Sequence, residues 1–369
     1  MIIVMKADVG EGSAEIPRII ERAHSFPGIT TQVHRIQGQT RGLTEIYLLG
    51  ATGVVPAEVF EEFESVEKVV RVTQKFRAIG RHDKLEAASF EYRGIRIAQD
   101  TLHVFPGLCA VDTREHQDMT FAALQRAGIK TARAGAYKPR TSPYDFQGLG
   151  QACLPWLFES AGKHGIQIVT MEVTHESHID EIKRALAQSG EATGVMLQIG
   201  TRNAQNFELL KAVGQQTELP VLFKRGMGIS LEESLNACEY VASGGNRRIV
   251  FCLRGVKSHL GEPHRNFVDF AHVSVVQRLT RLPVCVDPSH SVGRRISGAD
   301  GLLDIFHVTA QGIVTGANMV LIDVHPRPDK ALCDGPQALL LEELPGLLED
   351  IAITRAAYEK RVAAARARA

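Results

Sequence analysis

The sequence lacks several features that would assign a protein to a class at once. It carries no excess of charge, because 42 basic and 42 acidic side chains give a formal net charge of +0. Nucleic-acid-binding proteins usually have a basic excess, so we expect no nucleic-acid partner. No apolar run approaches the roughly 18 residues that a transmembrane helix requires. Residues 1–20, MIIVMKADVGEGSAEIPRII, also lack the apolar region of a secretory signal. We therefore expect no membrane partner.

Paired cysteines are absent as well. The six cysteines are scattered, with no CxxC motif: Cys109, Cys153, Cys238, Cys252, Cys285 and Cys333. This spacing argues against a disulfide framework and is typical of a reduced, cytoplasmic protein. Two motifs of other enzyme classes are missing too. The chain has no GxSxG nucleophile turn and no GxxxxGK[ST] phosphate loop.

The composition is that of an ordinary globular protein. Hydrophobic residues make up 44% of the chain and charged residues 23%, which excludes disorder throughout. With 369 residues, the chain is long enough for two domains or for a large barrel with an additional module.

Residues 1–72 have the pattern of a small α+β domain. Apolar periodicity predicts strands at 1–6, 30–37, 45–51 and 67–73 and helices at 14–26 and 56–66. The resulting order βαββαβ is typical of a ferredoxin-like domain. Residues 73–100 show no strong periodicity, and we interpret them as a linker.

Residues 101–369 alternate short apolar runs with helical patterns. We predict strands at 102–109, 131–137, 166–173, 194–200, 220–226, 248–255, 283–290 and 319–326. Most intervening segments have helical spacing, and many of them end in glycine. Eight such repeats favour a (β/α)8 TIM barrel, while an open parallel sheet is the alternative.

The predicted strand ends are rich in cations. Active sites of this barrel lie at the carboxyl ends of its strands, and these ends carry Arg133, Lys138, Arg140, Arg202, Lys224, Arg225 and Arg254, with Gln198 beside them. Too few acids share these positions for us to expect a set of structural ion pairs. Arginine and lysine bind phosphate and carboxylate groups. The pattern thus predicts a small substrate with several negative charges.

Four further residues could hold a metal. Cys109, His290, Asp323 and Asp334 combine thiol, imidazole and carboxylate groups that suit a divalent ion such as Mn, Fe, Co or Zn. Their wide separation in sequence makes this weak evidence. The alternative is that Cys109 is a small buried hydrophobic residue and that His290 makes a local hydrogen bond.

Several segments resemble one enzyme family. The segment GAYKPRTSPYDFQGLG at residues 135–150 is similar to the signature of 3-deoxy-D-arabino-heptulosonate 7-phosphate (DAHP) synthases. LQIGTRNAQNFELLKAVG, LFKRGM, DPSHSVGRR and DVHPRPDKALCDGPQ resemble further blocks of that family in the same order. The string KPRTSP differs from the KANRTS-like string of the sister octulosonate 8-phosphate synthases. The N-terminal domain resembles the extension of the short bacterial subclass.

The resemblance implies a metal-dependent condensation of phosphoenolpyruvate with erythrose 4-phosphate, the first step of aromatic amino acid biosynthesis. It implies that phosphoenolpyruvate is held by Arg133, Lys138, Arg202, Lys224 and Arg254. Lys138 would also transfer a proton, and Arg140, Thr141 and Ser142 would hold the sugar phosphate. Cys109, His290, Asp323 and Asp334 would ligate the metal. A homo-oligomer, either a dimer or a tetramer, and an aromatic amino acid effector are further implications.

The sequence departs from the family pattern near the expected site. Leu108 replaces the proline before the ligand cysteine, which would free its backbone, and Asp323 replaces a longer glutamate. Met171 stands at the place of an acidic residue, so that Glu172 would point to the other face of the strand. Leu253 replaces a glutamate, and Thr201 an alanine. Two alternatives therefore stay open: a diverged enzyme with another acceptor or enolpyruvyl substrate, and a non-catalytic anion-binding relative.

Overall fold

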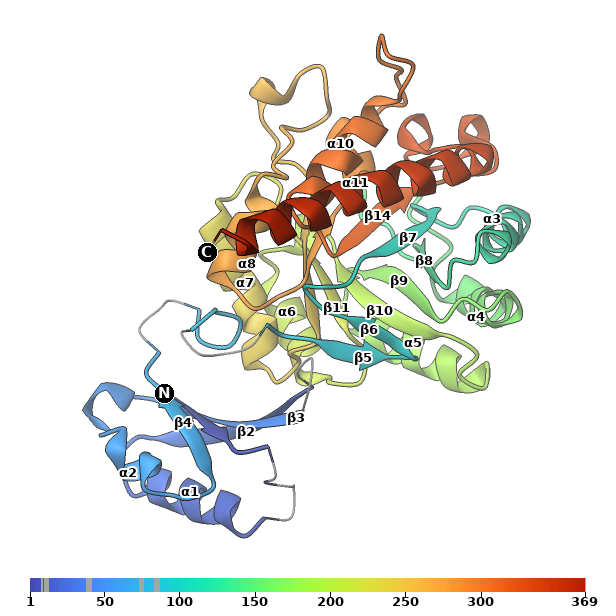
Figure 1. The fold of residues 1–369 in the computed structure, drawn as a ribbon. Helices are drawn as coiled ribbons and strands as arrows, with labels where there is room; N and C mark the ends of the chain where they lie inside the picture. The colour runs from blue at the N-terminus through green and yellow to red at the C-terminus, as the bar shows by residue number, and fades with distance from the viewer. Residues whose placement is uncertain (8, 10–12, 38–41, 73–75, 83–86, 369) are drawn as a thin grey trace.

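The protein consists of a small N-terminal α+β domain beside a larger barrel (Figure 1). The structure is a computed structural model that describes residues 1–7, 9, 13–37, 42–72, 76–82 and 87–368. No helix in these described ranges is both long and apolar enough to cross a membrane.

The N-terminal domain is ferredoxin-like, as predicted. Its elements are β1 (Ile2–Met5), α1 (Glu15–His24), β2 (Thr30–Gln37), β3 (Gly42–Leu49), α2 (Glu58–Glu61) and β4 (Val66–Val70). The strands pair antiparallel in the order β2-β3-β1-β4. One face of α1 carries Ile16, Ile19 and Ala23, which pack in the core of the domain. The helical spacing of these apolar residues therefore accounts for the packing of α1 against the sheet.

A buried ion pair joins this domain to the barrel. The Arg281 guanidinium lies 3.1 Å from Oε1 of Glu45 and donates to the Tyr47 hydroxyl at 3.0 Å. Arg247 lies over the Tyr47 ring, 3.8 Å from its centroid. Arg281 precedes β13 (Val284–Val286), so the domain contacts the barrel at the amino ends of its strands, away from the catalytic face of such folds.

The segment that we interpreted as a linker contains regular structure. Strands β5 (Phe90–Tyr92) and β6 (Ile95–Ile97) form an antiparallel hairpin. Phe90 and Ile97 pack against Phe105 and other side chains of the barrel interior. The hairpin therefore closes the amino end of the barrel. Strands of three residues are too short to show the alternation of apolar and polar residues that predicts a strand.

The larger part is a closed parallel barrel, and all eight predicted strands are present. They are β7 (His103–Leu108), β8 (Thr131–Ala134), β9 (Ile168–Val173), β10 (Gly194–Ile199), β11 (Val221–Lys224), β12 (Ile249–Leu253), β13 and β14 (Met319–Asp323). β14 pairs with β7 and closes the ring, which excludes the open-sheet alternative.

Helices surround the barrel on its outer face (Figure 1). They are α3 (Arg114–Arg126), α4 (Leu154–Lys163), α5 (Ser177–Gln188), α6 (Phe207–Gln215), α7 (Leu231–Ser243), α8 (His272–Leu279), α10 (Asp304–Val314) and α11 (Leu344–Arg366). The short helix α9 (Pro288–Val292) instead lies at the carboxyl end of β13. Side chains of the strands alternate between this helix layer and the barrel interior. This alternation decides which residues at the strand ends can reach a ligand.

Candidate active site

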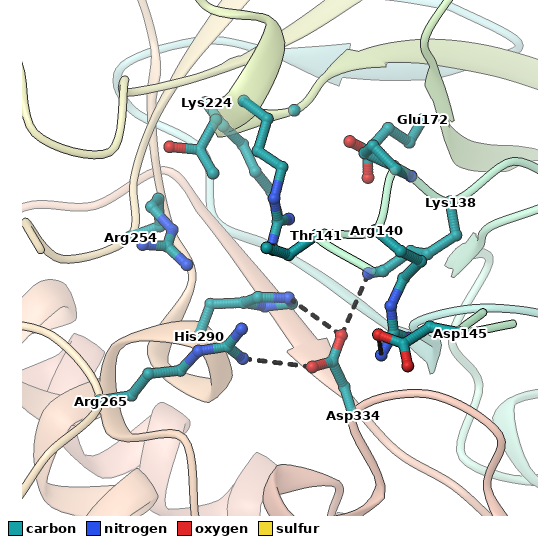
Figure 2. A pocket seen from close by; sticks show the side chains of 14 residues that line it. Lys138, Arg140, Thr141, Asp145, Glu172, Lys224, Arg254, Arg265, His290 and Asp334 are labelled. Carbon is teal, nitrogen blue, oxygen red and sulfur yellow. Dashed lines mark hydrogen bonds and ion pairs between the residues drawn. The ribbon is translucent and has the colours of Figure 1, made fainter. Parts of the chain in front are cut away.

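The carboxyl ends of the strands surround a polar cavity of about 210 Å³. Figure 2 shows side chains from several strand ends and their loops converging on it. Eight residues predicted from the sequence line this cavity: Lys138, Arg140, Thr141, Arg202, Lys224, Arg254, His290 and Asp334. The structure thus brings residues from six separate segments of the chain to one place.

Cys109 lies at the centre of a group of charged side chains. Its Sγ accepts a hydrogen bond from Lys138 Nζ at 2.7 Å and another from Arg133 Nη2 at 3.2 Å. It lies 3.0 Å from Asp334 Oδ2 and 3.6 Å from His290 Nε2. Burial raises the pKa of this thiol well above its usual range, and a hydrogen bond to Cys333 adds to the increase. Cys109 is therefore no plain hydrophobic residue, because its polar contacts point inward to the cavity wall.

Strand pairing fixes the backbone before Cys109. Gly107 pairs with Arg133 on one side and with Asp323 on the other, and Leu108 pairs with Ala134. Gly107 has φ of +153°, and a Cβ there would lie 2.0 Å from the carbonyl oxygen of Arg133. The β ladder thus pairs Gly107 on both sides and Leu108 on one side, directly before Cys109.

His290 is positioned by Asp287, which begins helix α9. The Asp287 carboxylate accepts hydrogen bonds from the backbone N–H of His290 at 3.2 Å and from its Nδ1 at 3.1 Å. This capping aims Nε2 at Cys109 and Asp334. Burial alone would lower the pKa of His290, but the charges of Asp287 and Asp323 outweigh it and raise that pKa to about 10.

Two aspartates complete the cluster. Asp323 forms an ion pair with Arg133 and accepts a hydrogen bond from Gln337. Asp334 lies 3.1 Å from Lys138 Nζ and 3.2 Å from Arg265 Nη1, as Figure 2 shows. Burial opposes ionisation of Asp334, but the Lys138 ammonium and His290 hold its pKa well below the usual range.

These residues, which we call the ligand cluster (Cys109, His290, Asp323 and Asp334), fit a divalent metal. The ligand atoms of Cys109, His290 and Asp323 lie within 4.8 Å of one another, and so do those of Cys109, Cys333 and Asp334. Oδ1 of Asp323 is buried and pairs with Nη1 of Arg133. A soft thiolate, an imidazole and carboxylates together suit a borderline transition metal but do not select one.

Most of the cations at the strand ends have acidic partners, contrary to the sequence expectation. Lys224 lies 2.6 Å from Asp287, Arg140 3.1 Å from Asp145 and Arg225 2.6 Å from Asp269. Arg133 and Lys138 pair with Asp323 and Asp334 as described above. The acidic partners come from other strand ends and from loops. The sequence of a single strand end therefore does not show which acid its cation will meet.

Arg254 and Arg202 differ from the other cations. Neither forms an ion pair with another residue in the described ranges of the chain. Arg254 is only 2% exposed, its Nε has no hydrogen-bond partner, and burial lowers its pKa. A buried guanidinium without a carboxylate is costly, so the cavity offers an incoming anion its strongest unsatisfied donor here.

Glu172 points into the cavity, which corrects a second expectation. It lines the cavity wall, where Gln198 Nε2 donates to its Oε2 at 3.2 Å, whereas Met171 packs in the outer core. Gly200 makes room for this carboxylate, because a Cβ there would lie 1.8 Å from Glu172 Oε1. The site therefore retains an acid at the end of β9.

Leu253, Gln198 and Ser142 do not line the cavity, whereas Thr201 does. Leu253 packs in the helix-side core, and Gln198 is buried behind Glu172. The Ser142 hydroxyl accepts from the backbone N–H of Tyr144 within its own loop. The Thr201 hydroxyl donates to the carbonyl oxygen of Arg225. Ser142 and Gln198 thus act on the cavity only through their neighbours in this structure.

Two residues at the site were not predicted. Arg265 lines the cavity and binds Asp334 and Gln337, and it belongs to a loop without a recognisable motif. Cys333 lies beside Cys109, and that hydrogen bond lowers its pKa. Cys333 directly precedes Asp334, a predicted metal ligand, and this position in the sequence could have indicated that Cys333 lies at the site.

The fold and the site define a class of protein: a (β/α)8 barrel with an anion-binding, metal-compatible cavity at the carboxyl ends of its strands. Family models make this specific. The DAHP synthetase I family matches residues 72–356, and the DAHP synthase ferredoxin-like domain matches residues 1–74. The chain belongs to the DAHP synthetase I family.

Curated relatives and solved structures agree with this assignment. Phospho-2-dehydro-3-deoxyheptonate aldolase of Thermotoga maritima is 36% identical over 95% of this chain and 96% of its own length. The crystal structure of that aldolase (DAHP synthase) matches with a TM-score of 0.68 and 35% identity, covering 96% of this chain and 97% of its own. A 2-dehydro-3-deoxyphosphooctonate aldolase of Syntrophobacter fumaroxidans is 27% identical over 72% of this chain and 91% of its own length.

Proposed function

We propose that this protein condenses phosphoenolpyruvate with erythrose 4-phosphate to give DAHP and inorganic phosphate. The observation that carries the proposal is one cavity that is lined by an unpaired buried arginine, Arg254, and by His290 and Asp334 of the ligand cluster. Two phosphorylated substrates need cations to offset their mutual repulsion, and the cavity places cations on opposite sides of the ligand cluster (Figure 2). Binding both substrates there supplies proximity and orientation.

Phosphoenolpyruvate would occupy the side of the cavity that holds Arg254, Lys224 and Arg202. Arg254 is not paired with a carboxylate in the described residues, so it can bind an anion without first breaking an ion pair. Arg133 does not line the cavity and donates to Cys109 Sγ, so it would act on the substrate only across that thiol. Arg133 thus serves mainly to neutralise Asp323 and to orient Cys109.

Erythrose 4-phosphate would place its phosphate near Arg140 and Thr141, at the rim formed by the KPRTSP loop. Arg202 Nη2 lies 3.5 Å from the Thr141 hydroxyl, so the rim and the phosphoenolpyruvate side are contiguous. The aldehyde of a sugar held this way faces the ligand cluster. Ser142 would support the loop and not contact the phosphate.

A divalent metal held by Cys109, His290, Asp323 and Asp334 would polarise the aldehyde oxygen as a Lewis acid. C3 of phosphoenolpyruvate attacks the aldehyde carbon, forming the new C–C bond. Lys138 is placed to donate a proton to the aldehyde oxygen. Burial opposes its charge, but Cys109 and Asp334 hold its pKa well above the usual value. Water adds to C2. The C2–O bond to phosphate then breaks, the electron pair leaves with the phosphate, and the remaining C2 hydroxyl passes its proton to the phosphate and becomes the ketone. Glu172 lies in the cavity wall to accept the proton of that water.

The remaining expectations belong to the same proposal. We propose a homo-oligomer and an aromatic amino acid effector that binds through the N-terminal domain. Because that domain contacts the amino end of its own barrel, an effector bound there would influence a catalytic face through a neighbouring subunit.

The direct test is phosphate release by the reduced full-length protein with phosphoenolpyruvate, erythrose 4-phosphate and Mn²⁺. We expect release that needs both substrates, stops with a chelator and returns on adding metal. The matched experiment replaces erythrose 4-phosphate with other phosphorylated aldoses. Preference for one of these would establish the diverged-enzyme alternative, and tight binding of phosphoenolpyruvate without release under any condition would establish the non-catalytic one.

A further inference from the structure

Cys333 is a second thiol in contact with the ligand cluster. Its Sγ lies 3.2 Å from Asp334 Oδ2, the same oxygen that lies 3.0 Å from Cys109 Sγ. The two sulfurs and the carboxylate lie within 4.8 Å of one another. Cys333 is 8% exposed. Its side chain is therefore buried beside the ligand cluster.

The local backbone turns Cys333 and Asp334 toward the same point. Adjacent residues of an extended chain point to opposite sides, but Asp334 has φ of +54° in the left-handed region. Gly335 follows, and a Cβ there would lie 2.2 Å from the carbonyl oxygen of Pro328. A left-handed conformation at a residue other than glycine costs of order 1 kcal/mol of folding free energy. In this conformation the side chains of Cys333 and Asp334 both lie close to Cys109.

The separations between these donors resemble those of a four-coordinate metal site. Metal–ligand bonds of about 2.0–2.3 Å in a tetrahedron place neighbouring donors roughly 3.3–3.8 Å apart. His290 Nε2 lies 3.6 Å from Cys109 Sγ and 3.6 Å from Asp334 Oδ2. Asp334 Oδ2 thus contacts both sulfurs, at 3.0 and 3.2 Å, and lies 3.6 Å from the imidazole nitrogen.

Asp323 is the donor in the cluster that is most engaged elsewhere. Its carboxylate forms the ion pair with Arg133 and accepts from Gln337. Its Oδ2 lies 3.7 Å from Nδ1 of His290, not from the Nε2 that faces Cys109. The Cys333 thiol, whose contacts are with Asp334 and Cys109, therefore competes with fewer protein partners for an ion than this carboxylate does.

We infer that Cys333 supplies a second thiolate ligand to the metal, so that sulfur contributes two of its donors. The inference rests on the metal site of the proposed function and goes beyond its four ligands. Two thiolates make the site softer, which favours Zn, Fe and Co over Mn and Mg. The physiological ion would then be one that binds sulfur strongly.

The test uses Co²⁺ as a spectroscopic probe in the full-length protein. The metal-free protein, kept reduced with a phosphine, is titrated with Co²⁺ without oxygen, and the sulfur-to-cobalt absorption is recorded per bound ion. In Cys333→Ser we expect one bound ion, about half of that absorption, and binding weaker by roughly tenfold or more. X-ray absorption of the zinc-loaded wild type counts the sulfurs independently, and we expect two.

Cys153→Ser is the matched control, because Cys153 is also buried but donates to the carbonyl oxygen of Gly150. We expect its spectrum to equal that of the wild type. One sulfur per zinc, or a Cys333→Ser spectrum equal to that of the wild type, would overturn the second thiolate alone. Absence of any sulfur band in the wild type, or a band that Cys109→Ser leaves unchanged, would overturn the proposed metal site itself. The zinc count needs no variant, so it decides the question even where Cys333→Ser does not fold.

Discussion

Two buried groups of metal-compatible residues lie at the carboxyl ends of the barrel strands, and they differ in how well their polar atoms are satisfied. One is the ligand cluster. The other, the histidine cluster, consists of Asp112, His116 and His325, whose ligand atoms also lie within 4.8 Å of one another. Asp112 follows β7 and His325 follows β14. Each cluster therefore includes one residue just after β7 and one at or just after the end of β14, and composition alone does not distinguish the two clusters.

In the histidine cluster every ring nitrogen has a protein partner. His325 Nε2 and His116 Nδ1 each lie 3.0 Å from an oxygen of Asp112. His325 Nδ1 accepts from the backbone N–H of Arg327 at 3.0 Å, and His116 Nε2 lies 3.3 Å from Arg327 Nη2. By contrast, the nearest polar atoms that face His290 Nε2 are at 3.6 Å. Saturated hydrogen bonds next to strand ends indicate a structural role, and unsaturated donors that line a cavity indicate a binding site.

The largest expected effect comes from removing the imidazole of the ligand cluster. His290→Ala should lower metal affinity and the rate of phosphate release by more than about 100-fold, because outer-sphere changes alone cost 10–100-fold. Equilibrium dialysis with metal analysis and a phosphate-release assay would measure both.

The matched variant is His325→Gln in the histidine cluster. It should keep metal stoichiometry, and its turnover should stay close to that of the wild type. If His325→Gln lost the metal and His290→Ala kept it, the assignment of the two clusters would be reversed.

Arg254 offers a second contrast between binding and stability. Arg254→Met should raise the KM for phosphoenolpyruvate roughly 10- to 150-fold, which corresponds to a lost charged hydrogen bond of about 1.5–3 kcal/mol. The thermal midpoint of the substrate-free protein should not fall, since a buried guanidinium without an ion-pair partner is removed. Steady-state kinetics and thermal melting would measure the two effects. A lower midpoint with unchanged KM would mean that Arg254 serves the fold and not the substrate.

The fold was predictable because the barrel repeats one signal eight times. Each strand is a short apolar run, and most are followed by a helical pattern, so an error in one repeat does not change the architecture. The hairpin β5–β6 was missed because its strands are three residues long. Its role depends on Phe90 and Ile97 packing against strands that are far away in the sequence.

The site was predictable in its residue types but less so in its pairings. Lys138, Arg254, His290 and Asp334 were found from strand ends and from family resemblance, and all line the cavity. Which cation meets which acid depends on loops, as the contact of Arg265 with Asp334 shows. The orientation of Glu172 depends on the register of β9, which turns Glu172 toward the cavity and Met171 toward the outer core.

Stability should respond more to the histidine cluster than to the ligand cluster. His325→Ala leaves one oxygen of buried Asp112 and the N–H of Arg327 without partners, which should cost about 1–3 kcal/mol of unfolding free energy. Urea unfolding monitored by circular dichroism would measure this loss. His325→Asn, which keeps one donor and one acceptor, should restore part of it. Equal stability of the alanine variant and the wild type would contradict a structural role.

The smallest expected effect is the pH dependence of Asp112. Burial opposes its charge, but hydrogen bonds from His325 and His116 lower the pKa of Asp112 to about 2, from 3.8 in the unfolded chain. A carboxyl with a lowered pKa stabilises the fold fully above its unfolded pKa, and this contribution disappears as the pH falls toward about 2. Asp112→Asn should therefore cost about 1–2 kcal/mol near neutral pH, after allowance for solvent screening. Urea unfolding should show that the difference in unfolding free energy between wild type and variant is constant between about pH 7 and 5 and shrinks below about pH 4.

Asp300→Asn is a control, because the Asp300 carboxylate is exposed and its replacement should have a smaller effect at any pH. A difference that grows as the pH falls would show that Asp112 is held protonated in the folded protein, and the histidine cluster would then have lost the ionic pairing that separates it from the ligand cluster.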